Sequence, residues 1–355
     1  MLARRHHAAL QAPVSGKFGL EPVQWFHHSL RRERARADLT GRTLALVLFT
    51  PRERRSANKT NARIARVLRQ KLCPSDEAGW FDERRIAVLL PDALTGAASQ
   101  LADEVCLAFP LSASPPLCEV FAYPTDHLPD EGPGGPPGNA HDGRPRVRHL
   151  AGVFIRPLQG WKRLLDLVGT AVGLVLLAPL LLLIAIAIKL ESPGPVLFRQ
   201  RRTGRGGTPF VMYKFRSMAA DAEARKVDLL RWNEQDGPAF KIKADPRVTR
   251  LGRWLRKTSL DELPQLINVI RGEMSLVGPR PLPCDESDAC LRWQRRRLDV
   301  TPGLTCTWQV RGRSRVTFDE WMRMDLEYVD SVSPGHDLRL LIATLVAVVR
   351  GRGAY

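Results

Sequence analysis

The chain of 355 residues lacks several features that mark common classes of protein. Its six cysteines contain no CxxC pair, and no histidine cluster accompanies them, so nothing supports a zinc site. The first 20 residues carry charges and histidines but no apolar stretch, which argues against a cleaved secretory signal. We therefore expect reduced thiols in the cytosolic compartment.

Acidic residues are also scarce relative to basic ones. The chain has 37 Asp and Glu against 54 Lys and Arg, a formal net charge of +17. Such an excess indicates a polyanionic partner: nucleic acid, an anionic membrane surface or a phosphorylated substrate. The charge alone does not choose among them. Hydrophobic residues make up 44%, enough for a sizeable buried core.

Glycine and proline concentrate in one segment, which divides the chain. Residues 131–138 read Glu-Gly-Pro-Gly-Gly-Pro-Pro-Gly, which supports neither a helix nor a central strand. We predict a cytosolic accessory domain over residues 1–128, a linker over residues 129–152 and a second domain over residues 153–355.

The first domain shows strands alternating with helices. Apolar runs predict strands over residues 43–49, 85–90 and 117–123, and periodic patterns predict helices over 58–72 and 97–107. This order indicates a small α/β domain. Residues 76–91 faintly resemble the central hairpin of GGDEF-type nucleotide cyclase domains, although the Gly-Gly-Asp-Glu-Phe signature is absent. A degenerate, non-catalytic relative and a generic α/β domain both fit the pattern.

One long apolar run follows the linker. Residues 167–188 carry no charge and would span about 33 Å as a straight helix, roughly a bilayer core. Pro179 lies near the middle, and both flanks are basic, whereas a spanning helix normally has Lys and Arg biased to one side. A bent hairpin that returns to the same leaflet and a simple span both remain open. The shorter run at 338–349 predicts an interfacial or a core helix.

Charged motifs are dense after the apolar run. In residues 245–257, Val248, Leu251, Trp254 and Leu255 recur at helical spacing among five Lys and Arg residues. The pattern fits a solvated helix face. Beside a membrane segment we favour a helix that contacts anionic headgroups or a phosphate site.

An adjacent carboxylate pair, Asp261 and Glu262, follows this helix. Ser259 and Glu262 have the spacing of a capping box, and this structural role is the stronger interpretation from spacing alone. Next to a basic helix, the same pair suits binding Mg²⁺ or attack on a phosphorus. Further on, two prolines in Gly-Pro-Arg-Pro at 278–281 form a rigid turn that presents Arg280, either to solvent or to a phosphate.

In this order the motifs resemble the bacterial sugar transferase family of monotopic phosphoglycosyltransferases, over residues 161–355. The resemblance rests on the following matches: Lys-Arg-Leu-Leu-Asp at 162–166, the apolar run, Lys-Phe-Arg at 214–216, Leu-Asp-Glu-Leu at 260–263, Gly-Pro-Arg-Pro at 278–281, Pro-Gly-Leu-Thr at 302–305, Gln309, and Gly-Arg at 312–313. It implies an α/β chain whose second, mostly helical domain is a monotopic membrane catalytic domain. Its re-entrant helix would cover residues 167–190 and break at Pro179.

Two positions depart from the family pattern. Ala178 stands before Pro179, where the family often has serine. Cys306 occupies the last position of the family's Pro-Gly-x-Thr-Gly run, where a positive φ would strain any residue except glycine.

The resemblance also implies a reaction. Asp261 would attack the β-phosphorus of a UDP-sugar, release UMP and carry the sugar phosphate until polyprenyl (undecaprenyl) phosphate accepts it. Glu262, together with Asp261, would hold Mg²⁺. The candidates for phosphate and substrate contacts are Lys214, Arg256, Arg280 and Arg313.

The expected location is the cytoplasmic face of the bacterial inner membrane, in contact with its lipids and at the start of exopolysaccharide or O-antigen synthesis. The resemblance leaves a homodimer open. No nucleic-acid recognition motif is present, so we expect no nucleic-acid partner. The alternative is a membrane-tethered, non-catalytic regulator that senses a nucleotide, in which Asp261 would be dispensable.

Overall fold

The structure is a computed structural model that describes residues 16–110, 112–124, 147–219, 221–242, 244–311 and 316–349. The chain divides into two compact units, Met1–Phe154 and Ile155–Tyr355. Both units combine helices with strands, so the chain is of mixed α/β class.

The first unit is built on a five-stranded sheet of order β2-β3-β1-β4-β5. The central strand β1 (Leu44–Thr50) pairs antiparallel with β3 (Ile86–Pro91) and β4 (Leu117–Tyr123). These three strands confirm the predicted ones. The edge strands are β2 (Glu77–Trp80) and β5 (Val147–His149), and β5 runs parallel to β4. The end of the range predicted as a linker, 129–152, therefore holds a strand, and residues 125–146 lie outside the described part.

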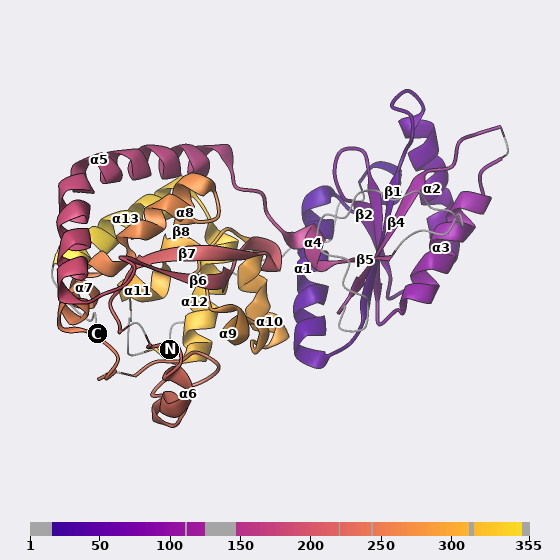
Figure 1. Cartoon of the computed structure of the whole chain (residues 1–355). Coiled ribbons are helices and arrows are strands. Elements are labelled where there is room, and N and C mark those ends of the chain that lie inside the picture. The colour runs from indigo at the N-terminus through magenta and orange to yellow at the C-terminus, as the bar shows by residue number, and fades with distance from the viewer. Residues whose placement is uncertain are drawn as a thin grey trace, which may run out of the picture. The chain divides into compact units, whose positions relative to one another are not determined.

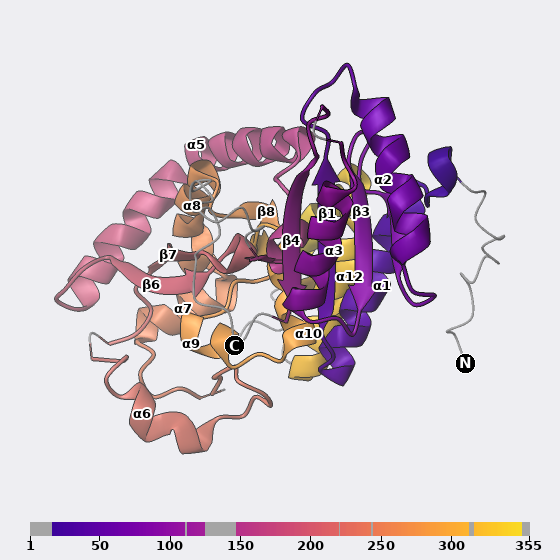
Figure 2. The same ribbon diagram turned by 90° about the vertical axis from the view of Figure 1, so that its right-hand side faces the viewer.

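Helices cover both faces of this sheet (Figures 1 and 2). On one face, Ala45, Val47 and Phe49 of β1 join a core with residues of two helices. On the other face, Leu44, Leu46 and Leu48 join a second core with residues of α1. Alternate side chains of a strand point to opposite faces, so burial on both sides explains why β1 is apolar without interruption. The elements are α1 (Val23–Thr40), α2 (Ala57–Lys71), α3 (Thr95–Leu107), α4 (Ala151–Phe154) and the 3₁₀ turn η1 (Lys17–Gly19).

The second unit is mostly helical and holds two small sheets. Strands β6 (Leu197–Thr203) and β7 (Pro209–Phe215) form an antiparallel hairpin, and β8 (Ser275–Val277) pairs parallel with β9 (Gly303–Thr305). The α-helices are α5 (Gly160–Glu191), α6 (Lys226–Leu229), α7 (Arg250–Thr258), α8 (Leu266–Arg271), α9 (Cys284–Asp288), α10 (Arg292–Arg295), α11 (Thr307–Arg311), α12 (Phe318–Ser331) and α13 (Pro334–Val349). The 3₁₀ helices are η2 (Arg205–Gly207), η3 (Leu230–Trp232), η4 (Leu260–Gln265) and η5 (Arg296–Asp299).

Helix α5 contains the long apolar run and bends sharply within its length (Figure 1). It has Pro179 in its interior, and a proline removes one backbone hydrogen bond and favours a kink. Among the described residues it is the one helix long and apolar enough to cross a membrane. Ile184 and Ile188 are buried against the unit, whereas Val175 and Leu176 are about three-quarters exposed. One stripe of α5 therefore packs on the unit, and the rest presents an apolar surface.

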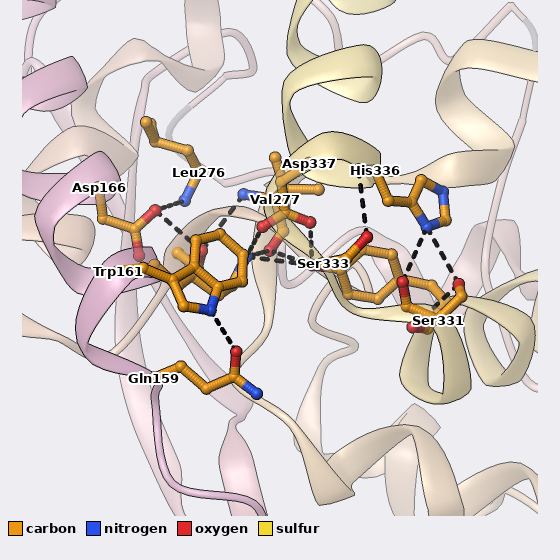
Figure 3. Close-up of polar contacts among 12 residues, drawn as sticks. Gln159, Trp161, Asp166, Leu276, Val277, Ser331, Ser333, His336 and Asp337 are labelled. Carbon is orange, nitrogen blue, oxygen red and sulfur yellow. Dashed lines mark hydrogen bonds and ion pairs between the residues drawn. The ribbon is translucent and has the colours of Figure 1, made fainter.

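The start of α5 is fixed by buried polar contacts (Figure 3). The Lys162 ammonium donates to the Val277 carbonyl oxygen at 2.9 Å and pairs with Asp337. The Asp166 carboxylate accepts from the Ser275 hydroxyl at 2.9 Å and from the Leu276 amide at 2.8 Å. These contacts hold β8, which leads directly into the turn that carries Arg280. The Lys-Arg-Leu-Leu-Asp motif thus joins the start of α5 to β8 and to the turn that carries Arg280.

Candidate active site

The Asp261–Glu262 pair lies in η4, immediately after α7. Ser259 separates the two helices and has φ +59, a left-handed conformation that is uncommon for residues other than glycine. Its side chain makes no capping hydrogen bond. The capping-box interpretation of Ser259 and Glu262 is therefore wrong, because the Glu262 carboxylate is drawn to two cations instead. The sharp turn buries Asp261, which is 7% exposed.

Glu262 is the centre of a mostly buried charged group with Lys214 and Arg280, whose side chains are 16–18% exposed. Lys214 Nζ lies 3.1 Å from Oε1, Arg280 Nη1 donates to Oε2 at 2.9 Å, and Arg280 Nη2 also contacts Oε1. Burial alone would raise the pKa of Glu262, but the charges of Arg280 and Lys214 hold it well below its usual range. Burial lowers the pKa of Lys214 to about 8, partly offset by Glu262.

Asp261 has a different environment, although it is the next residue along the chain. Its carboxylate makes no hydrogen bond or ion pair with any residue in the described part of the chain. Burial and the neighbouring Glu262 raise its pKa to about 6, against the opposing charges of Lys214, Arg256 and Arg280. An unpaired carboxylate close to cations has free lone pairs and is suited to act as a nucleophile or a metal ligand.

Arg256 comes from the predicted basic helix. The helix begins at Arg250 rather than at Val248, because the Thr249 hydroxyl caps it by accepting from the Gly252 amide. Arg256 Nε donates to the Ser217 hydroxyl at 3.0 Å. Burial lowers the pKa of Arg256, partly offset by Asp261. The helix therefore directs this arginine inward, while Trp254 is 49% exposed.

The predicted residues Lys214, Arg256, Asp261, Glu262 and Arg280 all line one cavity of about 1490 Å³. Arg313, the sixth candidate, lies outside the described residues. The lining also includes a group of apolar side chains from α5, α13 and the segment at the start of β6: Leu177, Val196, Leu197, Leu341 and Leu345. The cavity thus combines cationic side chains with apolar side chains from α5 and its neighbours.

The sequence did not single out several charged residues of this cavity. Arg202 of β6 donates to the Pro281 carbonyl oxygen at 2.8 Å, next to Arg280. Burial lowers its pKa to about 10. Lys226 and Glu286 also line the cavity. A signal for Arg202 existed in the basic segment that starts at Phe198, whereas Lys226 and Glu286 reach the cavity only through tertiary packing.

The carboxylate pair fits one mode of Mg²⁺ binding. Within the described ranges there is no group of three or more His, Cys, Asp or Glu side chains that could hold a metal by itself. Mg²⁺ commonly takes one or two carboxylates, several waters and the substrate's phosphates. The unpaired Asp261 carboxylate and the adjacent Glu262 match that mode, in which the metal binds together with the substrate.

At Cys306, which replaces a glycine of the family pattern, φ is not positive. The cysteine therefore causes no backbone strain of the kind considered from the sequence.

Comparison with known proteins identifies the family. The family model described as "Bacterial sugar transferase" matches residues 158–351, more than half of the chain. The chain belongs to this family.

Several curated relatives share this region. The galactosyl transferase CpsE of Streptococcus agalactiae serotype III is 44% identical over 194 residues, 54% of this chain and 43% of that protein. The UDP-glucose:undecaprenyl-phosphate glucose-1-phosphate transferase of Caulobacter vibrioides is 41% identical over 250 residues, 68% of this chain and 86% of that protein. ExoY, an exopolysaccharide production protein of Rhizobium meliloti, is 40% identical over 210 residues, 57% of this chain and 91% of that protein. The chain thus spans less than half of CpsE but most of the other two.

Solved structures give only a weak likeness to GGDEF domains. The match to the GGDEF domain of DgcB from Caulobacter crescentus covers 32% of this chain and 80% of the DgcB chain, with 12% identity and a TM-score of 0.27. The match to the GGDEF domain of YfiN from Pseudomonas aeruginosa covers 30% of this chain and 74% of the YfiN chain, with 22% identity and a TM-score of 0.26. At these scores the likeness assigns neither a fold nor a function.

Proposed function

We propose that this protein transfers a sugar-1-phosphate from a UDP-sugar to undecaprenyl phosphate and so initiates the synthesis of an exopolysaccharide or O-antigen type of glycan. The observation that carries the proposal is the unpaired Asp261 carboxylate beside the Lys214–Glu262–Arg280 group, in a cavity with a cationic and an apolar region. Such a cavity suits a reaction between a water-soluble anion and a lipid phosphate. The names of two relatives agree with it: the Caulobacter glucose-1-phosphate transferase and the undecaprenyl-phosphate galactose phosphotransferase of Salmonella typhimurium.

The reaction would proceed in two displacements at phosphorus. In the first, an Asp261 carboxylate oxygen forms a bond to the β-phosphorus as the bond to the UMP oxygen breaks, leaving an aspartyl phosphosugar. In the second, a phosphate oxygen of the polyprenyl phosphate attacks the same phosphorus and frees Asp261. Each step exchanges one P–O bond for another. Lys214, Arg256, Arg280 and Arg313 would neutralise the charge on the phosphoryl oxygens.

Magnesium would be held by Asp261 and Glu262 together with the substrate's phosphates. When bound, it supplies positive charge that screens the diphosphate from the carboxylates. We expect chelation with EDTA to abolish transfer and excess Mg²⁺ to restore it, measured as UMP release. Transfer that continues unchanged in EDTA, in protein verified to be free of metal, would contradict the magnesium proposal.

We place α5 as a re-entrant helix over residues 167–190, at the cytoplasmic face of the inner membrane. The bend in the helix that contains Pro179, the basic flanks and the exposed apolar surface support this placement. A membrane-impermeant maleimide applied to spheroplasts tests it at two positions: Cys73, which is exposed in the first unit, and an engineered Glu327→Cys in the second. Re-entry protects both thiols until lysis. A simple span exposes one of them.

The reaction is tested by UMP release from a panel of UDP-sugars, using purified protein, Mg²⁺ and undecaprenyl phosphate. We expect one or a few donors to release UMP with turnover that depends on the lipid. Binding of UDP-sugars without UMP release from any donor would contradict the proposal and favour the non-catalytic regulator.

A further inference from the structure

Besides the Asp261–Glu262 pair and the exposed Glu223, one mostly buried carboxylate lines the active-site cavity. It belongs to Glu286 of α9, whose side chain is 11% exposed. The phosphates of a nucleotide diphosphate would repel a carboxylate that lay beside them without cations to neutralise it. Glu286 therefore faces a different part of the ligand, or none.

The contacts of Glu286 leave one oxygen available. Oε1 accepts from the Phe240 amide at 3.4 Å and lies 3.8 Å from Lys226 Nζ. Oε2 has no partner in the described part of the chain. Burial raises the pKa of this carboxyl group, partly offset by Arg202 and Lys226. A partly buried carboxylate oxygen with no protein partner needs water or a ligand donor group.

The position of Glu286 relates it to the reacting phosphorus. Arg202 contacts the Pro281 carbonyl oxygen next to Arg280, and its charge acts on both Glu262 and Glu286. The chain reaches Glu286 only six residues after Arg280. In a UDP-sugar the sugar is attached to the phosphorus that Asp261 would attack, whereas the base is attached through the ribose and the second phosphate. Groups next to the reacting phosphate therefore meet the sugar first.

An aromatic ring completes this part of the cavity. Phe240 lines it, and its ring lies 5.6 Å from Lys226 Nζ and 5.2 Å from the Arg247 guanidinium. Arg247 is held in a buried pair with Asp245 at 2.7 Å. Binding sites for small molecules commonly combine an aromatic wall with a few fixed polar groups that set orientation and specificity.

We propose that Glu286 binds a hydroxyl group of the donor sugar through Oε2, beside the Phe240 ring, and thereby sets the choice of sugar. This inference rests on the proposed function, because it assumes a UDP-sugar as donor. Carboxylates are strong acceptors for hydroxyl donors, and a site built to bind a hydroxyl group discriminates strongly against ligands that lack it.

The test compares Glu286→Gln with a matched control, Asp285→Asn. Both acids lie within 4 Å of Lys226 Nζ, at 3.3 Å for Asp285 and 3.8 Å for Glu286, but the Asp285 side chain is 69% exposed and does not line the cavity. Both changes are made in an Asp261→Asn background, in which the bound donor is not consumed. Titration calorimetry gives the affinities for the preferred UDP-sugar and for UDP, which has the same nucleotide and both phosphates but no sugar.

We expect Glu286→Gln to weaken UDP-sugar binding about 10- to 100-fold, while the affinity for UDP changes less than about twofold. Asp285→Asn should leave both affinities nearly unchanged. Equal weakening of UDP and UDP-sugar would overturn the inference, because Glu286 would then serve the nucleotide. Unchanged binding in Glu286→Gln, or an equal effect of Asp285→Asn, would overturn it as well.

The proposed function is judged separately, by UMP release from the chain with Asp261 intact. A sugar-dependent affinity change without any UMP release would support the subsite and contradict the reaction. UMP release together with equal loss of UDP and UDP-sugar binding would support the reaction and contradict the subsite. Absence of binding to both ligands would contradict both.

Discussion

The two units of the molecule bury different kinds of side chain. The first unit encloses its sheet in apolar residues, and the buried charged residues in its described part are Glu33 and Arg34 of α1. The second unit buries many more charged residues: Lys162, Asp166, Arg216, Arg247, Asp261, Arg297, Asp325 and Asp337. Removing charges from water is costly, and apolar side chains of similar volume often stabilise a protein as well or better. The buried charges of the second unit are therefore better explained by positioning and chemistry than by stability.

The buried charges of the second unit themselves fall into two kinds. Arg297 pairs with Asp325 at 2.7 Å, and Lys162 pairs with Asp337, so each of these charges has its counterion. Among the residues that the structure describes, Asp261 has no such partner. The difference separates charges that hold the backbone from a charge that we propose is available to a substrate, and substitutions can test it.

The largest contrast is expected between a mostly buried arginine of the candidate site and an exposed arginine of the first unit. Arg280→Ala removes a mostly buried partner of Glu262 and a proposed phosphate contact, so we expect transfer to fall about 10²- to 10³-fold and stability to fall by about 3 kcal/mol. Arg42→Ala is the control in the first unit. It breaks an exposed pair with Asp92 and should cost under about 0.5 kcal/mol.

Thermal unfolding and UMP release measure the two effects of this comparison. Similar losses in Arg42→Ala and Arg280→Ala would contradict the view that burial distinguishes the two units.

A smaller effect is expected from pH. Asp261 must be ionised to act as a nucleophile, and with a pKa of about 6 it should give kcat/KM at pH 5 roughly a tenth of the plateau value. The rate should fall again above pH 8, where Lys214 loses its charge. Lys214→Met should remove the alkaline limb. It should also move the acidic limb to higher pH, because Lys214 lowers the pKa of Asp261.

A pH profile of UMP release for the parent chain and Lys214→Met checks these shifts. An acidic limb that stays in place in the variant would show that Lys214 does not act on Asp261.

The smallest effect concerns the stability cost of Asp261. Its pKa is raised in the folded protein, so the ionised form destabilises the fold above the unfolded pKa near 4, and the cost is complete above pH 6. Asp261→Asn should therefore raise stability at pH 7.5 by roughly 1–2 kcal/mol. The gain should shrink toward pH 4. Thermal unfolding at the two pH values measures it, and destabilisation at pH 7.5 would mean that Asp261 has a structural partner.

Parts of the fold were predictable because local sequence determined them. Strands β1, β3 and β4 are apolar runs that can be recognised directly in the sequence. Helix α1 was missed because Phe26, Leu30 and Ala37 form its buried stripe among charged residues. Strand β5 was missed because it lies next to the Gly- and Pro-rich segment and forms only by pairing with β4.

The site shows the same limit. Asp261, Lys214 and Arg280 were found through motifs. The prediction that Ser259 and Glu262 form a capping box was wrong, because their spacing carries no information about the distant cations that bind Glu262. Glu286 was missed for a related reason. Its neighbours Phe240 and Lys226 precede it by more than 40 residues, and no local pattern connects them. Short-range signals predict elements, and long-range packing decides which charges meet.

The most direct test of the central claim is to trap the phosphosugar on Asp261. Purified protein is mixed with Mg²⁺ and its preferred UDP-sugar in the absence of lipid acceptor, and both UMP release and intact protein mass are followed. The account predicts a burst of up to one UMP per protein and a mass increase of one sugar phosphate, located at Asp261 by peptide mapping. Both signals should be absent in Asp261→Asn. On addition of undecaprenyl phosphate, the mass increase should be lost and UMP release should continue with turnover. A burst and mass increase that persist in Asp261→Asn, or lipid-dependent transfer with no intermediate at any time, would contradict Asp261 as the nucleophile.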